Sequence, residues 1–185
     1  METLKNKKLI IYVVMGLLSI LSLYSEIVIC TYVQTLDCIV ELVALCIMFA
    51  LIFYYAISNF KVPHSNLLKY LFVAFSAMTF VGLLAGVSAG GVPQENVYLC
   101  QLTRGIVVIV SAYIAGRLDR IKENTYLIAT SGFILLVTSI ININLYGVED
   151  FIAIVYETNF FILWLDLTIA YLFRYYGHKE AGKTE

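Results

Sequence analysis

Five ionisable side chains lie within long apolar stretches of this 185-residue chain, where a charge is expensive: Glu26, Glu41, Arg104, Glu157 and Asp166. At the centre of a membrane helix such a residue costs about 2.5–3.5 kcal/mol on insertion scales, so it usually faces the interior of a helix bundle. The planar guanidinium of an arginine suits a carboxylate, which it binds through two parallel hydrogen bonds. One arginine among several glutamates therefore predicts either a structural ion pair or a site for a charged ligand.

The depths of these residues place four of them in one layer. If the apolar stretches cross a membrane in alternating directions, Glu26 lies near the outer end of the first. The other three lie roughly 6–12 Å below the outer boundary by the helical rise. Adding the neighbouring polar residues, the expected ligand-binding set is Arg104, Glu41, Glu157, Gln101, Glu26 and Asn159.

Two interpretations of this layer remain open. In the first, Arg104 forms an ion pair with Glu41 or Glu157 that fixes the order of the helices. In the second, a pocket opens outward, in which Arg104 binds an anionic group or the surplus carboxylates bind a cation. One arginine facing three glutamates leaves unpaired charge that a simple staple does not need, which supports the second interpretation.

Asp166 is expected in the inner half of the membrane, away from the other ionisable residues and beside Trp164. A carboxyl group there can carry protons during transport. The alternative that we favour is a protonated carboxyl group hydrogen-bonded to a neighbouring helix.

The elements that position these residues follow from the apolar runs. Hydrophobic residues make up 61% of the chain and charged residues 14%, far from the balance of a soluble domain. A hydrocarbon core of about 30 Å needs roughly 20 helical residues, and in lipid a helix satisfies its own backbone. We therefore predict an all-α integral membrane protein, a single membrane domain over 1–185 with six transmembrane helices near 9–30, 37–58, 67–88, 96–116, 124–145 and 151–173.

The basic residues predict the orientation, because Lys and Arg favour cytoplasmic links. Of the 12 basic residues, all but Arg104 lie in the N-terminal segment, the second and fourth links, and the tail. The charged residues of the other three links are all acidic: Asp37, Glu95, Glu149 and Asp150. Both termini are therefore expected in the cytoplasm of a multi-pass protein of the bacterial cytoplasmic membrane, with the lipid bilayer as its partner.

Small residues at four-residue spacing predict where helices approach closely, as they commonly do in lipid. Such a row starts in the third run and comprises Ala74, Met78, Gly82, Gly86 and Gly90. The fourth run offers Gly105, Ala112 and Gly116, which we expect to form a second close-packed face.

Recognisable catalytic chemistry is missing from the sequence. The histidines, His64 and His178, fall on the inner side, whereas the cysteines nearest the membrane border fall on the outer side. No metalloprotease, nucleophile-elbow or phosphate-binding motif occurs. We therefore expect no enzyme, no metal and no cofactor, and no basic stripe suggests nucleic acid. Cys30 and Cys38 bracket the first link, where they either form a disulfide in an oxidising compartment or pack unpaired.

One stretch resembles a known family. Asn-Leu-Leu-Lys-Tyr-Leu-Phe-Val-Ala-Phe-Ser-Ala-Met-Thr-Phe-Val-Gly-Leu-Leu-Ala from Asn66, followed by Gln101-Leu-Thr-Arg104-Gly, is similar to membrane-associated sensor (MASE-type) domains, closest to their third class. With Glu41 in the preceding helix, the similarity covers about residues 41–117. The resemblance implies the sensory input region of a bacterial histidine kinase or diguanylate cyclase. Where that family commonly has Asp-Leu-Leu-His, this chain has Gly82-Leu-Leu-Ala, and the tryptophan usual before the arginine is absent. The resemblance therefore implies a ligand-binding role at two positions of this chain, Arg104 and Glu41.

These observations favour a bacterial membrane sensor whose outer-half pocket binds a small-molecule ligand. The signal is expected to leave through the last helix and the basic tail to a cytoplasmic partner or output domain. The substrate-binding subunit of a vitamin-type importer is the alternative, and a structural or assembly protein without a ligand is a third.

Overall fold

A computed structural model describes residues 2–33, 36–58, 66–88, 94–146 and 151–181. Over these ranges the chain forms six α-helices and no strand, which confirms the predicted all-α class. They are α1 (Glu2–Val33), α2 (Leu36–Ile57), α3 (Asn66–Ser88), α4 (Gln94–Gly116), α5 (Ile121–Tyr146) and α6 (Phe151–Ala181). The first helix begins before the predicted residue 9 and the last continues past residue 173, because backbone hydrogen bonding carries a helix beyond its apolar segment.

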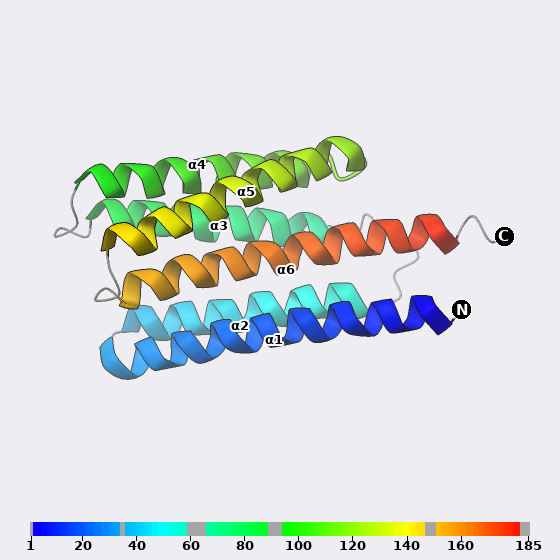
Figure 1. Ribbon diagram of the computed structural model, residues 1–185, viewed down its shortest axis with the longest axis horizontal. Coiled ribbons are helices and arrows are strands. Elements are labelled where there is room, and N and C mark those ends of the chain that lie inside the picture. Colours follow the sequence, from blue (N-terminus) through cyan, green and yellow to red (C-terminus); the bar gives the residue numbers. More distant parts are fainter. Residues whose placement is uncertain (1, 34–35, 59–65, 89–93, 147–150, 182–185) are drawn as a thin grey trace.

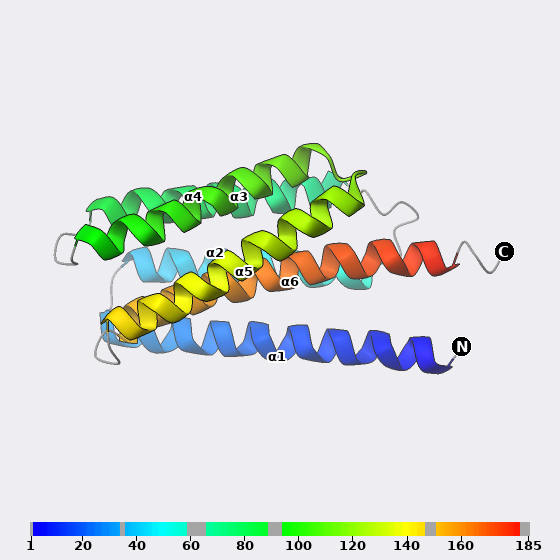
Figure 2. The same cartoon turned by 45° about the horizontal axis from the view of Figure 1, so that its top comes forward.

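Successive helices run up and down along one long bundle, so that both ends of the described chain lie at the same end (Figure 1). Short links between helices favour this antiparallel order. The last helix is central and contacts α1, α2, α3 and α5, whereas α4 packs on α3 and α5. A turned view shows α1 and α4 on opposite sides of the bundle (Figure 2). Any site built from α6 therefore has walls from several helices.

The bundle is apolar outside and partly polar inside. Large hydrophobic side chains such as Leu17, Ile109 and Phe133 are 63%, 70% and 67% exposed. Many serine, threonine and asparagine side chains are buried instead, together with Glu26 and Asp166. A soluble protein rarely exposes so much contiguous apolar surface. This distribution suits a protein whose surroundings are lipid.

Three stretches are long and apolar enough to cross a membrane by length and composition: Leu9–Thr31, Cys38–Ile57 and Ile121–Ile141. Shorter apolar stretches cover Asn66–Val81 and Leu102–Gly116. The chain is therefore compatible with a membrane location.

An aromatic core lies where α3 meets α6. The Trp164 ring is 5.3 Å from that of Phe75 and 6.2 Å from that of Phe72, between ring centroids. Phe72 also meets Tyr171 edge-on at 5.8 Å. Such ring pairs add about 0.5–1.5 kcal/mol each beyond the area they bury. These rings hold the middle of α6 in place against α3.

The predicted close-packed face of the fourth helix is wrong. Ala112 and Gly116 are exposed, and a Cβ added at Gly105 or Gly116 meets nothing within 4 Å. The side of α4 that is buried instead carries Thr103, Val107, Ser111 and Ile114. Small residues permit close approach, but the larger side chains of the helix decide which face turns inward. The packing around Gly82, Gly86 and Gly90 lies outside the described part of the chain.

Candidate functional site

One face of α1 is buried from Met15 to Ile29, and it is unusually polar. Its buried positions alternate in steps of four and three residues: Met15, Ser19, Ser22, Glu26 and Ile29. This is the spacing of a coiled-coil seam, in which one stripe of a helix faces a partner. Three of the five positions are polar, so the stripe cannot be explained by apolar packing alone.

The partner of this stripe is α6, and the two helices meet in layers seven residues apart. Three side-chain contacts define the layers, namely Tyr12 with Phe173, Ser19 with Asp166, and Glu26 with Asn159. Each step of seven residues forward on α1 matches seven residues back on α6, about 10.5 Å along the helix. The antiparallel pair therefore keeps one register over all three layers. We call this interface the α1–α6 seam.

Asn159 is the hub of the outermost layer and uses both ends of its amide group. Its Oδ1 accepts hydrogen bonds from Ser22 Oγ at 2.8 Å and Ser25 Oγ at 3.0 Å. Its Nδ2 donates to Glu26 Oε2 at 2.8 Å. Glu26 is 0% exposed, and its second oxygen, Oε1, has no hydrogen-bond partner among the described residues. Among the described residues, one oxygen of this fully buried carboxyl group is thus hydrogen-bonded and the other is not.

Asp166 occupies the next layer and is also 0% exposed. Its Oδ2 lies 2.7 Å from Ser19 Oγ, while Oδ1 has no partner in the described part of the chain. Asp166 was expected to lie away from the other ionisable residues, and the partner that the structure gives it, Ser19, is not ionisable. Its spacing of seven residues from Asn159 turns both side chains towards α1. The expected hydrogen bond between Asp166 and a neighbouring helix is present, with Ser19 of α1 as the donor.

No basic side chain neutralises these two carboxyl groups within the described seam. The next basic residue along α6 is Arg174, about 12 Å further by the helical rise. Arg174 donates to the backbone oxygen of Tyr55 and lies over its ring, 4.7 Å from the centroid. A buried carboxylate without a cation is very costly, and in proteins such a group takes up a proton or a counter-ion. The seam can therefore hold positive charge in the form of protons or a small cation.

The other predicted site residues are distributed differently. Glu41 is half-buried on α2 and Arg104 is half-buried on α4. The helix that carries Arg104 contacts α3 and α5 but neither α1 nor α2 over the described residues. The side chains of Gln101 and Glu157 lie outside the described residues. The structure therefore brings Glu26 together with Asn159, and a single pocket containing all four charges stays a prediction.

At the other end of the bundle, hydrogen bonds tie α6 to the turn between α4 and α5. Asn124 Nδ2 donates to the backbone oxygen of Arg117 at 2.8 Å and to Tyr171 Oη at 2.9 Å. The Tyr171 hydroxyl donates in turn to the backbone oxygen of Leu118 at 2.9 Å. On the opposite side, the Tyr12 hydroxyl donates to the backbone oxygen of Ala56 at 3.0 Å. The region around Arg174 is therefore held by four helices.

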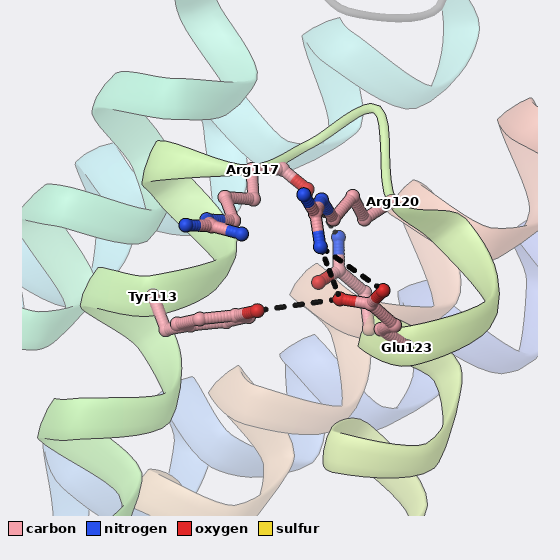
Figure 3. Close-up of polar contacts among 5 residues, drawn as sticks. Tyr113, Arg117, Arg120 and Glu123 are labelled. Carbon is pink, nitrogen blue, oxygen red and sulfur yellow. Dashed lines mark hydrogen bonds and ion pairs between the residues drawn. The ribbon is translucent and has the colours of Figure 1, made fainter.

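The same turn carries an exposed charged cluster (Figure 3). Arg120 Nη1 lies 3.2 Å from Glu123 Oε1, and the Tyr113 hydroxyl donates to Glu123 Oε2 at 3.3 Å. The Arg117 guanidinium lies 5.5 Å from the centroid of the Tyr113 ring. Both partners of the ion pair are about half exposed, and such pairs contribute about 0–1 kcal/mol. This cluster shapes the surface of the turn and adds little stability.

Cys30, Cys38 and Cys46 form no disulfide among the described residues, and Cys30 packs beside the buried pair Ile29 and Cys38. Of the two predicted alternatives, the structure has the one without a disulfide. Among the described residues, no three His, Cys, Asp or Glu side chains gather closely enough to hold a metal ion.

Sequence reasoning missed Ser19, Ser22 and Ser25 as site residues. The signal was present: Ser19, Ser22 and Glu26 share one helical face, and Asn159 and Asp166 share another. Serine attracts little attention in a membrane helix because its hydroxyl can always bond a carbonyl of its own helix. Comparisons with protein-family models, curated proteins and solved structures find no match for this chain.

Proposed function

We propose that this chain is a membrane-embedded sensory module, in which a ligand bound in the outer half of the bundle changes the packing of α6. The observation that carries the proposal is the position of α6. This one helix contributes Asn159 and Asp166 to the α1–α6 seam and Tyr171 and Arg174 to the contacts at the other end. A change at one end of a continuous helix reaches the other end.

The proposed topology has six transmembrane helices, with both termini in the cytoplasm of a bacterium. The alternation of basic and acidic links supports it, as does the apolar exterior of the bundle. Asp166 and Arg174 interrupt the apolar sequence of α6, but both are buried against other helices. Reporter fusions in each link test this topology, and an active extracytoplasmic reporter at the α4–α5 turn contradicts it.

The mechanism requires two arrangements of the bundle that differ in affinity for the ligand, because a ligand shifts an equilibrium only by its differential affinity. In our proposal, a change of charge at Glu26 alters the hydrogen bonds of Asn159 and hence the tilt or rotation of α6 against α1. Arg174 lies 15 residues further along the same helix, about 22 Å by the helical rise. In this mechanism, the change in α6 reaches the cytoplasmic side through the contacts of Arg174 with Tyr55 on α2.

The resemblance to MASE-type domains is consistent with this role, and in that case Arg104 and Glu41 form a further part of the outer site. The output then lies in a separate cytoplasmic partner or output domain. An importer subunit differs in its readout, since its ligand leaves the protein on the inner side of the membrane.

The test measures the distance between two spin labels at the inner end of the bundle. Tyr176 on α6 and Lys122 on α5 are exposed and suit labelling in a cysteine-free background. The protein in lipid is compared across a panel of small metabolites, salts and acidic buffers. We expect at least one condition to raise the thermal midpoint and to shift the label distance. Stabilisation with an unchanged distance, followed by ligand release inside vesicles, identifies an importer subunit, and no response to any condition contradicts the sensor.

A further inference from the structure

The two buried carboxyl groups of the seam differ in how well each accommodates a proton. At Asp166, the carboxyl oxygen Oδ2 lies 2.7 Å from Ser19 Oγ, and either group can be the donor. The serine hydroxyl donates to an ionised carboxylate, and a protonated carboxyl group can donate to the serine oxygen. A protonated Asp166 can donate to Ser19, which leaves only a carbonyl-type oxygen, Oδ1, without a partner. An under-satisfied carbonyl oxygen is among the less costly buried defects. Asp166 is therefore well accommodated as a neutral acid.

Glu26 has the opposite arrangement. Its bonded oxygen, Oε2, must act as an acceptor because Asn159 Nδ2 is a donor. A proton on this carboxyl group therefore resides on Oε1, which has no partner in the described part of the chain. Without the proton, Oε1 carries negative charge in a fully buried position. Oε1 therefore lacks a hydrogen-bond partner among the described residues in both states, and only the ionised state also carries a buried negative charge. A proton or a small cation at Oε1 neutralises that charge.

The oxygens around Asn159 suit such an ion. Ser22, Ser25 and Asn159 each bring an oxygen into the same layer as Glu26, and both serine hydroxyls lie within hydrogen-bond distance of Asn159 Oδ1. Hard cations prefer oxygen ligands, and a single carboxylate balances a single positive charge. The donor set therefore fits a small monovalent cation better than a divalent one.

We propose that Glu26 and Asn159, with Ser22 and Ser25, form a reversible binding site for a small monovalent cation, either a proton or Na⁺. The site names the ligand class of the proposed sensor and rests on the proposed function for its consequence. Binding itself is measured without reference to signalling. Asp166 stays protonated in both states and is not part of the exchange.

Other titratable groups lie on three helices near this end of the seam. Cys30 is one turn further along α1 from Glu26, and the electrostatic surroundings of its thiol include Glu26 itself and, on α2, Cys38 and Glu41. On α6, Asp166 lies one layer deeper. None of these groups is basic, so none of them competes with a cation for Glu26.

The experiment follows the carbonyl stretch of protonated carboxyl groups by infrared difference spectroscopy in lipid, while the pH is raised. We expect the wild type to lose a protonated-carboxyl band. Glu26→Gln should abolish that change, whereas Asp166→Asn should retain it. Glu26→Asp serves as a second variant that keeps the acid and should keep a shifted band. Thermal midpoints of all variants show which of them are folded.

Two salts distinguish the two ions. If Na⁺ competes with the proton, the band disappears at a lower pH in NaCl than in choline chloride, and NaCl raises the thermal midpoint of the wild type but not of Glu26→Gln. If the two salts give the same titration, the ion is a proton. A band that titrates equally in folded Glu26→Gln, or a wild type with no titrating band, overturns the proposal. A titrating Glu26 without any change between the Tyr176 and Lys122 labels contradicts the sensor and leaves the ion site standing.

Discussion

Replacing Asn159 by leucine tests whether the outermost layer of the seam is an energetic unit. The change removes three hydrogen bonds at a buried position and keeps a side chain of similar size. Ser22 and Ser25 can turn to carbonyl groups of their own helix, as Ser25 already does towards Ser22. Glu26 has no such alternative among the described residues. The cost of Asn159→Leu therefore arises mainly at Glu26.

The stability lost on Asn159→Leu is set mainly by the buried Glu26 carboxyl group. A buried polar group that loses its partner costs about 1–3 kcal/mol. Single interhelical hydrogen bonds in membrane proteins average about 0.6 kcal/mol, with a maximum near 1.7. We expect Asn159→Leu to lower the free energy of unfolding by about 1–3 kcal/mol. Adding Glu26→Leu removes the stranded carboxyl group, so the double variant should be more stable than Asn159→Leu alone by about 1 kcal/mol or more.

The assay is reversible unfolding in mixed micelles by increasing denaturing detergent. Trp164 is the chain's one tryptophan and is 1% exposed, so its emission reports the loss of the core, and circular dichroism reports the helices. Asn124→Leu is the matched control, because Asn124 bonds Tyr171, about 18 Å along α6 from Asn159. Glu26→Leu with Asn124→Leu should be additive within about 0.5 kcal/mol. If the stability effects of Glu26→Leu and Asn159→Leu also add within about 0.5 kcal/mol, the energetic coupling between these two residues is refuted.

Three further predictions concern α6 and its neighbours, and all use the same unfolding assay. Asp166→Asn should change stability by less than about 1 kcal/mol, because a neutral amide retains the bond to Ser19; a loss of several kcal/mol shows that Asp166 is ionised. Arg174→Gln should cost about 1–3 kcal/mol through its lost bond and ring contact, whereas Arg120→Gln at a half-exposed pair should cost less than about 0.5; equal costs contradict this difference. Gly132→Ala should stabilise by about 0.5–1 kcal/mol, since the added Cβ makes an ordinary contact at 3.9 Å from Trp164 Nε1; a shifted Trp164 emission or a loss of stability shows that the space is tighter.

The six helices were predictable because long apolar runs leave the backbone few alternatives in lipid. Their ends were less so at Glu2 and Ala181, where polar residues continue a helix that hydropathy no longer marks. The packing face of α4 was predicted wrongly from Gly105 and Gly116. The spacing of small residues indicates where another helix can approach closely, but it does not indicate whether a helix lies on that face.

The candidate site was predictable only in part, for a related reason. Sequence reasoning identified Glu26, Asn159 and Asp166 as polar residues at costly positions. Depth along a helix gave a layer but did not say which helices adjoin, so Glu26 was grouped with Arg104, whose helix does not contact α1 over the described residues. Asp166 looked isolated because depth estimates compared charged residues only. Its partner, Ser19, carries no charge.

The polar composition of the seam gives the proposed mechanism its physical basis, because the contacts that set the position of α6 against α1 include two carboxyl groups. Lipid tails are as apolar as leucine, so apolar side chains alone give α1 little reason to prefer α6 over lipid. Directional contacts must then hold the pair in register, and two of its three layers depend on a buried carboxyl group. In a coiled coil, a buried polar residue likewise fixes register at some cost in stability. In the proposed mechanism, the contacts that hold α1 against α6 are therefore the same contacts that a cation at Glu26 alters.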